Sequence, residues 1–350
     1  MKPKILYIAP TKSTFVLKDI KLLAEHYTVR LSVAKLATKP LLVPAFLFIQ
    51  FFQILLTIHK YQVIIIMFGG YWSLMPTLLG RIFSKKVIVI AGGTDCVSYR
   101  SINYGNLRKP ILRKIIGWSY SLASVICPVD ESLIYFENSY YDSSHQGIKH
   151  YFPHIKTRIF TVCNGYEIPE KKTGRVREKN SFISVAFCNS LSKAKLKGLD
   201  LIIENAKFFP DTKFTIVGIE NPQGYFPGIP GNVYLIGKTD QKIVYSLFET
   251  SEFVIQCSIS EGFPNALCEA MSMGCIPIVS PVGAMPHIAG DIGFIVGKRS
   301  SNDFCAAIQR AISTGQDEKL VRSGRSIERI GTNYSEGNRI AQFVELIDSL

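Results

Sequence analysis

The sequence lacks the patterns that mark several common classes of protein. Its eight cysteines include no Cys-x-x-Cys pair and most stand in apolar segments, which argues for buried thiols in a reducing compartment and against a disulfide framework or a zinc site. Pro153 separates His150 from His154, and no His-Glu-x-x-His pattern occurs, so we expect no bound metal ion. Zinc-finger, RNA-binding and basic-zipper signatures are also missing, so we expect no nucleic-acid partner.

Targeting and membrane-spanning signals are also scarce. Met1 leads into a short apolar run with no longer one behind it, so no signal peptide is visible and we expect a cytoplasmic protein. Leu41 to Ile58 carries no charge, but Pro44 interrupts it. What remains from Ala45 makes about 21 Å of helix, which is short of the roughly 30 Å hydrocarbon core of a bilayer. We interpret this segment as a buried crossover helix, and a helix that dips into a membrane face is the alternative.

Positive charge is concentrated in the first half of the chain. With 350 residues, two domains are expected. Residues 1–170 hold 20 Lys and Arg against 9 Asp and Glu, a net +11, and residues 171–350 hold 20 against 18, a net +2, which together give the total of +13. This asymmetry indicates an anionic partner for the first half, either a membrane surface or a phosphate-bearing substrate.

One helix in the first half combines basic and apolar residues. Asn106 to Leu122 places Arg108, Lys109, Arg113 and Lys114 beside an apolar stripe, which predicts a basic amphipathic helix. Such a helix is either solvated on its basic face or in contact with an anionic surface or acceptor.

Strands and helices alternate along both halves of the chain. The expected strands are Ile5–Ala9, Thr28–Val33, Val63–Phe68, Val87–Ala91, Val125–Pro128, Phe182–Phe187, Phe214–Val217 and Val233–Ile236. The alternation predicts an α/β protein with Rossmann-like domains. No Gly-x-Gly-x-x-Gly motif follows the first strand, where Pro10-Thr11-Lys12-Ser13 stands, so dinucleotide oxidoreduction loses its main support.

The most informative stretch lies between residues 253 and 282. Two parallel buried strands are expected at Phe253–Ile259 and Cys275–Val279, joined by a tight turn and a helix over Pro264–Met273. The N–H groups at the start of that helix form an anion site. Glu261 lies in the turn and Glu269 inside the apolar helix. A carboxylate in so apolar a helix either reaches solvent on a narrow face or meets a ligand, for example the diol of a nucleoside.

The segment Glu261-Gly-Phe-Pro-Asn-Ala-Leu-Cys-Glu269 resembles the signature of glycosyltransferase family four, the retaining nucleotide-sugar glycosyltransferases of GT-B fold. The resemblance covers about residues 85–300. It implies two Rossmann-like domains facing a cleft, with Glu261 on the hydroxyls of the donor sugar and Glu269 on the ribose. The alternative, without the resemblance, is that Glu261 is only a charge at the N-terminus of a helix and that Glu269 is only a solvated side chain.

Further motifs follow the same family pattern. Lys197-Gly198 resembles the family's Lys-Gly motif, whose Lys binds the donor diphosphate, and Gly237-Lys238 stands where the family's backbone borders the base. The resemblance also implies that the amides from Gly262 through Phe263 and Pro264 to Asn265 contact the diphosphate. The family's usual Gly-Arg is absent, and Lys193 and Lys195 are the candidates to replace its Arg.

The loop Ala91-Gly92-Gly93-Thr94-Asp95 resembles a family loop that often reads His-Gly-Ser/Thr-Asp. Gly92 stands in place of that His, which removes an imidazole from the expected site. Thr94 and Asp95 remain as candidates. For Asp95 we keep both a catalytic role and a role in capping the loop.

The resemblance implies a GT-B protein in which residues 1–165 form the acceptor domain, residues 166–334 the donor domain and residues 335–350 a terminal helix that crosses back. We predict a metal-independent hexosyltransferase, because the Asp-x-Asp triplet of metal-dependent glycosyltransferases is missing. No cofactor is expected beyond the nucleotide-sugar co-substrate. The acceptor would be a glycan or a lipid-linked glycan in cell-surface polysaccharide synthesis, met in the cytoplasm or on the cytoplasmic face of a membrane. The alternatives are a nucleotide-sugar epimerase of the same fold and a catalytically inactive, sugar-binding relative.

Overall fold

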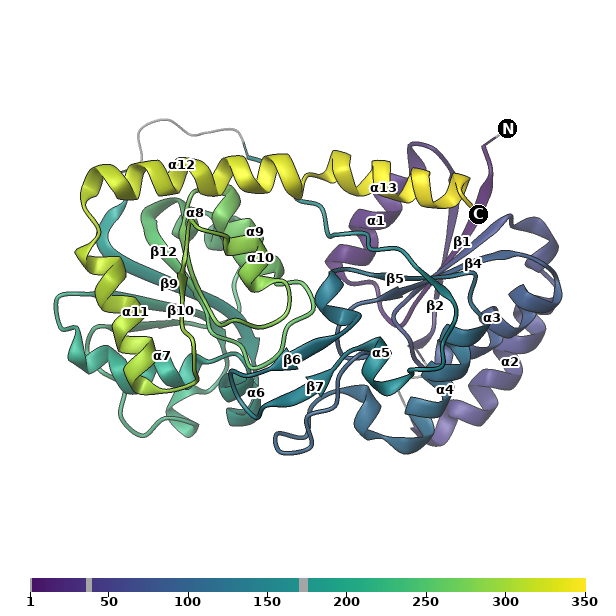
Figure 1. Cartoon of the computed structure of the whole chain (residues 1–350), viewed down its shortest axis with the longest axis horizontal. Helices are drawn as coiled ribbons and strands as arrows, with labels where there is room; N and C mark the ends of the chain where they lie inside the picture. The colour runs from purple at the N-terminus through teal and green to yellow at the C-terminus, as the bar shows by residue number, and fades with distance from the viewer. Residues whose placement is uncertain (1, 36–39, 170–175) are drawn as a thin grey trace. The chain divides into compact units, whose positions relative to one another are not determined.

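A computed structural model describes residues 2–35, 40–169 and 176–350 of the chain (Figure 1). The chain divides into two compact units, each built on a parallel sheet of six strands. Unit 1 comprises Met1–Phe136, His145–Cys163 and Glu336–Leu350, and unit 2 comprises Glu137–Ser144 and Asn164–Ser335. The predicted α/β architecture of two Rossmann-like domains is confirmed.

The sheet of unit 1 has the order β2-β1-β3-β4-β5-β8. Its strands are β1 (Lys4–Ala9), β2 (Thr28–Val33), β3 (Val63–Met67), β4 (Lys86–Ala91), β5 (Val125–Pro128) and β8 (Arg158–Ile159). All five residues of β3, which read Val-Ile-Ile-Ile-Met, are buried. Strands covered by helices on both faces need such continuous apolar runs, and the sequence located β1, β3, β4 and β5 to within one residue. Edge strand β8 was not predicted.

Helices cover both faces of this sheet (Figure 1). The connection from β1 to β2 runs one way across the sheet, and the connections through β3, β4 and β5 run the other way, so right-handed crossovers place their helices on opposite faces. One face carries α1 (Thr14–Ala24) and α13 (Glu336–Asp348), and the other carries α2 (Val43–Leu55), α3 (Tyr71–Ile82) and α4 (Pro110–Leu122). Shorter elements of this part of the chain are η2 (Pro40–Leu42), η3 (Ile58–Lys60), η4 (Asn106–Arg108), η5 (Glu131–Leu133) and α5 (Ile148–Tyr151).

A buried ion pair fastens α13 to α1 within unit 1. Arg339 donates from Nε and Nη2 to the two carboxylate oxygens of Asp19 at 2.7 and 2.9 Å, and both side chains are 2% exposed. Tyr7 donates to the same carboxylate at 2.8 Å, and burial raises the pKa of its phenol. Removing one member of such a pair would leave the other charge buried and uncompensated. Residues Glu336–Leu350 belong to unit 1, and α13 contributes Phe343 and Leu346 to its buried core.

The interpretation of Leu41–Ile58 as a buried crossover helix is wrong in part. Pro44 lies in the first turn of α2, where its missing N–H costs no hydrogen bond, so the helix begins at Val43. Only one side of α2 faces the core, and its other side exposes apolar side chains, among them Phe48 and Ile49; Leu56, which follows the helix, is exposed as well. No helix in the described parts of the chain is long and apolar enough to cross a membrane.

The sheet of unit 2 has the order β11-β10-β9-β12-β13-β14. Its strands are β9 (Glu178–Cys188), β10 (Lys213–Ile219), β11 (Val233–Ile236), β12 (Ser251–Gln256), β13 (Ile276–Val279) and β14 (Phe294–Ile295). The rings of Phe182, Phe214 and Phe253 stack across three neighbouring strands, with centroids 5.2 and 4.7 Å apart. The predicted parallel pairing of the two strands around the Glu261 turn is confirmed, because Phe253 pairs with Ile276 in parallel register.

The helices of unit 2 are α6 (Leu191–Leu196), α7 (Leu199–Asn205), α8 (Gln241–Thr250), α9 (Asn265–Ser272), α10 (Met285–Ala289), α11 (Ser301–Ser313) and α12 (Gln316–Asn333), with η6 (Ala206–Phe208) and η7 (Pro222–Gly224). Lys319 of α12 pairs with Glu252 of β12 at 2.8 Å, and both side chains are 5% exposed. This buried pair fixes the long helix against the sheet.

One excursion of the chain was not predicted. Residues 137–144, which include parts of the short strands β6 (Phe136–Asn138) and β7 (Ser144–Gln146), belong to unit 2. Asn138 donates to the Ile259 carbonyl at 3.0 Å, and Tyr140 donates to the Cys257 carbonyl at 3.3 Å. The later division falls between Cys163 and Asn164, two residues before the expected boundary.

Candidate active site

The sheet of unit 2 has a topological switch point between β9 and β12. From β9 the chain proceeds to β10 and β11 on one side, whereas β12, β13 and β14 continue on the other. In open parallel sheets, ligands bind outside the carboxyl ends of the strands at such a point. The segment after β9 carries Lys197, and the segment after β12 carries Glu261, so two of the predicted site residues meet there.

The segment after β9 is fastened directly to the segment after β12. Helix α6 ends at Leu196, and Gly198 adopts a left-handed conformation with φ of 75°. A Cβ atom on Gly198 would lie 2.3 Å from the Cys257 carbonyl oxygen, so a side chain does not fit there. The N–H of Ile259 donates to the Leu196 carbonyl at 2.8 Å. This contact brings Lys197 beside the Glu261 turn.

One carboxylate oxygen of Glu261 accepts three hydrogen bonds. Its Oε1 accepts from the ammonium of Lys197, from Gln256 Nε2 at 3.0 Å and from Ser258 Oγ at 3.1 Å. The Glu261 side chain is 12% exposed and that of Lys197 is 29% exposed. The carboxylate is therefore held in one orientation at the edge of the sheet. Sequence reasoning missed Gln256 and Ser258, although polar residues at the carboxyl end of an apolar strand were a usable signal.

The start of α9 differs from the prediction in one respect. Pro264 is the residue before the first helical turn and not its first helical position. Because proline has no N–H, the predicted series of amides offers only those of Gly262, Phe263 and Asn265. The positive end of the dipole of α9 still points out of this turn.

The side chains of two predicted donor-binding residues, Phe263 and Asn265, contact other residues of unit 2. The ring of Phe263 is buried and lies 6.2 Å from the ring of Tyr166 and 5.5 Å from that of Tyr334. The side-chain oxygen of Asn265 accepts from the Tyr166 hydroxyl and from Asn164 Nδ2, the latter at 3.2 Å. These side chains position the first turn of α9, so their backbone amides are what they can offer to a ligand.

Glu269 lies on the one side of α9 that is partly exposed; the rest of the helix is buried. Asn265 and Ala266, one turn earlier, share this side, whereas the residues on either side of Glu269, Cys268 and Ala270, are buried. The carboxylate therefore leaves the apolar face of the helix on a narrow, partly exposed side.

Two further lysines gather at the carboxyl end of β9. The ammonium groups of Lys193 and Lys238 each lie 5.9 Å from the centre of the Phe187 ring, and Phe187 is 51% exposed. Burial raises the pKa of the neighbouring Cys188, and the positive charges of Lys197 and Lys193 oppose this shift. Lys193 therefore lies near Phe187 and Cys188 at this end of β9, and the choice between Lys193 and Lys195 as the replacement for the family's Arg stays open. Gly237 and Lys238 are exposed beside Phe187.

Asp95 lies in unit 1 and is fully buried. Its Oδ2 accepts from the N–H of Gly69 at 2.8 Å and from the Tyr120 hydroxyl at 2.9 Å, and its Oδ1 accepts from the N–H groups of Gly92 and Gly93 at 3.1 and 3.0 Å. Burial raises the pKa of Asp95, and these hydrogen bonds oppose the shift. The carboxylate ties the loop after β3 to the loop after β4. This geometry favours the loop-capping role over direct contact with a substrate.

Phe68 explains why position 92 is a glycine. A Cβ atom on Gly92 would lie 1.6 Å from the Phe68 ring, so that ring occupies the space that a side chain at position 92 would need. Phe68 holds a left-handed conformation with φ of 65°, which is unusual for a bulky residue, and its ring lies 5.6 Å from that of Phe15. Strain of this kind gathers at functional sites, and no sequence signal pointed to Phe68.

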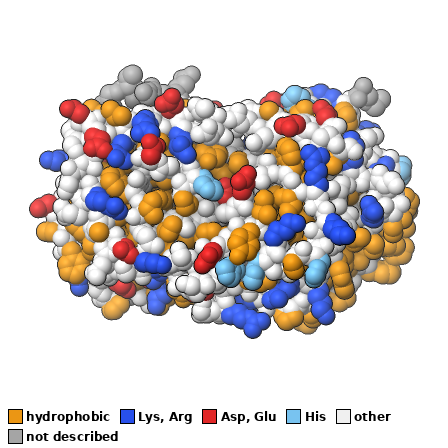
Figure 2. Space-filling model, in the orientation of Figure 1, with side chains coloured by type: hydrophobic (Ala, Val, Ile, Leu, Met, Phe, Trp, Pro, Cys, Tyr) orange, Lys and Arg blue, Asp and Glu red, His pale blue; other side chains and the backbone are white. Residues whose placement is uncertain are grey.

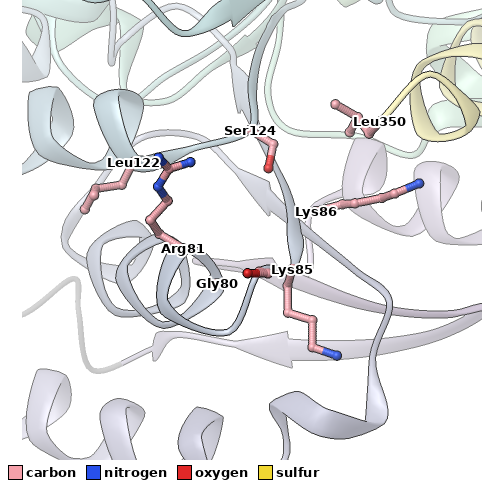
Figure 3. A pocket seen from close by; sticks show the side chains of 8 residues that line it. Gly80, Arg81, Lys85, Lys86, Leu122, Ser124 and Leu350 are labelled. Carbon is pink, nitrogen blue, oxygen red and sulfur yellow. The ribbon is translucent and has the colours of Figure 1, made fainter.

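The described residues contain no group of three or more His, Cys, Asp and Glu side chains that could hold a metal ion. Metal independence stays a prediction. A pocket of about 560 Å³ lies at the opposite, amino edge of the unit 1 sheet (Figure 3). Its lining includes Arg81, Lys85 and Lys86 and none of the predicted site residues. Figure 3 shows these three cations diverging, so they do not converge on one ligand.

Comparison with known proteins identifies the second half of the chain. Residues 183–314 match the family described as "Glycosyl transferases group 1". A phosphatidylinositol N-acetylglucosaminyltransferase subunit of Arabidopsis thaliana is 24% identical over 167 residues, which are 45% of this chain and 37% of that protein. The capsular polysaccharide biosynthesis glycosyltransferase CapH of Staphylococcus aureus is 33% identical over 132 residues, which are 35% of this chain and 36% of CapH. The matched part thus spans little more than a third of the length of these two relatives.

Solved structures are similar over the whole chain. Sucrose-phosphate synthase from Thermosynechococcus elongatus has a TM-score of 0.74 at 13% identity and covers 99% of both chains. HepE from Anabaena in complex with UDP and glucose has a TM-score of 0.70 at 14% identity, covering 99% of this chain and 100% of that one. At this identity the likeness shows the fold. The predicted membership is confirmed for the broad group, and family four itself stays a prediction. Residues 183–314 form a domain of the glycosyl transferases group 1 family, in a chain whose fold is GT-B.

Proposed function

We propose that this protein is a retaining glycosyltransferase that moves a hexose from a nucleoside-diphosphate sugar to an acceptor. The observation that carries the proposal is the pairing of Lys197 with Glu261 at the switch point of unit 2, inside the domain that matches glycosyltransferases. An ammonium and a carboxylate held together provide one group for the diphosphate and one for the sugar hydroxyls. Positioned charges of this kind stabilise the charge that develops on a leaving phosphate.

The remaining predicted residues complete a donor site in unit 2. Lys197 and the N–H groups of Gly262, Phe263 and Asn265 would bind the diphosphate at the positive end of α9. Glu269 would accept two hydroxyls of the ribose, and Gly237 with Lys238 would border the base. Glu261 would orient the sugar. On sequence grounds no residue qualifies as a covalent nucleophile, so a phosphate oxygen of the donor, together with groups of the cleft, would accept the proton of the incoming hydroxyl.

Unit 1 would bind the acceptor, which we propose to be a glycan or lipid-linked glycan of a cell-surface polysaccharide. The name of CapH supports this class of product, and the UDP and glucose in the HepE complex support a nucleotide-sugar donor. The reaction would take place in the cytoplasm, at the cytoplasmic face of a membrane.

The test begins with a thermal-shift screen against nucleotide sugars, because a ligand that binds only the folded state raises its unfolding temperature. The donor that stabilises the protein is then incubated with glycan and lipid-linked acceptors, and the anomeric configuration of the product is read by NMR. We expect transfer with retention and the same rate in EDTA. Loss of activity in EDTA that manganese restores would overturn metal independence.

The two alternatives give different results in the same assays. An epimerase would convert the nucleotide sugar rapidly with no acceptor present, whereas a transferase should show only slow hydrolysis. An inactive relative would bind the sugar and turn over nothing. Inversion of the anomeric centre would reject the retaining mechanism while leaving the donor site in place.

A further inference from the structure

Helix α2 of unit 1 has an apolar outer face. The chain carries no charged residue from Leu41 to Ile58, yet Phe48 is 66% exposed and Leu56 is 69% exposed. Phe48, Phe52 and Leu56 are spaced four residues apart, which places them on one stripe, and the rings of the first two lie 4.9 Å apart. A helix of a soluble protein normally turns charged or polar residues to water. An exposed apolar stripe of this kind marks an interaction surface.

The neighbouring helices extend this apolar surface. Helix α3 packs against both α2 and α4. It exposes Ile82 at its end, and α4 exposes Ile111 (70%) and Trp118 (57%). Figure 2 shows apolar side chains gathered at the right-hand end of the view, over α2, with Lys and Arg side chains nearby. We call the exposed side of α2, α3 and α4 the apolar-basic face.

The charge of this face has one sign. Between Glu25 and Asp130 the sequence contains twelve Lys and Arg and a single acidic residue, Asp95. Asp95 is fully buried. No carboxylate from this span therefore reaches the described surface. Lys109, directly before α4, and Lys114 on α4 are exposed, and Arg81 is exposed at the end of α3.

Only two of the four cations that the basic helix suggested face solvent. Arg113 donates to the Leu107 carbonyl at 2.6 Å and lies over the Tyr151 ring, so it fixes its own loop. The Nε atom of Arg108 is buried. Lys109 and Lys114 are the members of that cluster that remain directed to solvent.

We propose that the apolar-basic face docks unit 1 on the surface of an anionic lipid bilayer. Helix α2 would lie in the interface with its apolar stripe among the acyl chains, and Trp118 would lie at the level of the headgroups. The lysines would meet anionic headgroups. A second copy of the chain fits less well, because a two-fold dimer sets the same patch against itself and brings like charges together.

This inference deepens the membrane location given in the proposed function, and it is tested without a donor. The full chain is sedimented with vesicles of phosphatidylcholine alone and with phosphatidylglycerol added. We expect binding to the anionic vesicles that weakens as NaCl rises, because the Debye length falls from about 10 Å at 0.1 M to about 3 Å at 1 M. Tryptophan emission should shift to the blue on binding, and the shift should be absent in Trp118→Phe, which leaves only Trp72.

Two pairs of variants separate the apolar from the electrostatic contribution. Phe48→Ser/Leu56→Ser should weaken vesicle binding about tenfold or more, because two large apolar side chains no longer enter the bilayer. The matched control is Phe208→Ser/Leu320→Ser, with side chains of the same types in unit 2 that are 60% and 62% exposed, and it should bind as the wild type does.

The charge variant is Lys109→Ser/Lys114→Ser, which should lower binding to anionic vesicles about tenfold and flatten its salt dependence. Its control is Lys207→Ser/Lys242→Ser, which removes two exposed lysines of unit 2.

Three results would overturn the proposal. The first is wild-type protein that does not bind anionic vesicles at any salt concentration. The second is an equal loss of vesicle binding in the unit 1 variants and their unit 2 controls. The third is a dimer in analytical ultracentrifugation that the Phe48→Ser/Leu56→Ser changes dissociate. The last would assign the face to a second copy of the chain. Thermal shifts with nucleotide sugars are measured on the same variants and should be unchanged. Wild-type protein that shows the nucleotide-sugar shift but binds no vesicles would therefore reject the docking surface and leave the glycosyltransferase proposal untouched.

Discussion

In unit 2 the ammonium of Lys197 donates a hydrogen bond to Glu261, although 64 positions separate the two residues in the sequence. They form an ion pair in which the carboxylate is the less exposed partner. Gln256 and Ser258 donate to the same carboxylate oxygen. In the proposed reaction Lys197 serves the diphosphate and Glu261 the sugar. Each of the two groups therefore orients the other before a donor arrives.

Lys197→Ala should lower turnover by about 10² and change folding little. The lost charge acts on the leaving diphosphate, and removing one positioned donor at a site of developing charge typically costs about 10² to 10³ in rate. Gln256 and Ser258 still hold Glu261 in the variant. The measurements are kcat with the identified donor and the thermal unfolding midpoint. Lys207→Ala, an exposed lysine of the same unit, is the control, and wild-type turnover in Lys197→Ala would remove this residue from the mechanism.

Glu261→Gln should separate binding of the nucleotide from transfer of the sugar. The amide no longer holds the Lys197 ammonium as a counter-ion, so Lys197 becomes available to a phosphate and a negative charge is removed from the neighbourhood of the diphosphate. We expect tighter binding of the nucleoside diphosphate alone and a lower rate of transfer. Calorimetric titration with UDP, GDP and ADP checks the first expectation. Weaker binding of every diphosphate would show that the pair does not restrain Lys197.

Glu269→Ala should weaken donor binding through the ribose. A hydrogen bond to a charged group contributes about 1.5 to 3 kcal/mol, so losing two should cost a few kcal/mol of binding free energy. The sharp test compares the nucleotide with its 2′,3′-dideoxy analogue. Wild-type protein should prefer the ribose form strongly, and Glu269→Ala should bind both forms alike. If the variant keeps the full preference, the ribose is bound elsewhere.

The sequence was sufficient for the central strands of the first sheet, because strands buried on both faces must be apolar throughout. Val63–Met67 and Val125–Pro128 are examples, and each was located to within a residue. The sequence did not predict the two-residue edge strands β8 and β14. It was also sufficient to find Glu261, Glu269 and Lys197 through a local motif. Interpretation failed for α2, since an uncharged run does not reveal whether one face or both faces are buried.

The contacts that position the site could not be predicted, because they join distant segments. Glu261 meets Lys197 only after Gly198 has packed against the Cys257 carbonyl. The carboxylate of Asp95 accepts a hydrogen bond from the N–H of Gly69, which precedes it by 26 positions. Such contacts depend on which loops the fold brings to one edge of a sheet, and no periodicity records this.

The coupling of Phe68 with Gly92 makes the most direct test of the unit 1 loops. Gly92→His restores the side chain that the family resemblance leads one to expect, but its Cβ atom would lie 1.6 Å from the Phe68 ring. Overpacking of this kind typically costs about 1 to 3 kcal/mol, so the single variant should be destabilised by at least that amount. In Phe68→Gly/Gly92→His the ring is absent and a glycine takes the left-handed position, so the double variant should be more stable than the sum of the two single changes predicts. We expect a coupling free energy of about 1 to 3 kcal/mol in the double-mutant cycle.

The unfolding of unit 1 can be followed separately within the full chain, because both tryptophans, Trp72 and Trp118, belong to that unit. Their fluorescence during urea unfolding reports its free energy of unfolding, with Phe68→Gly as the single-variant reference. A Gly92→His protein as stable as the wild type, or additive effects in the cycle, would mean that the Phe68 ring moves aside at little cost. In that case contact with the substrate, and not the Phe68 ring, would be the reason why a side chain is excluded at position 92.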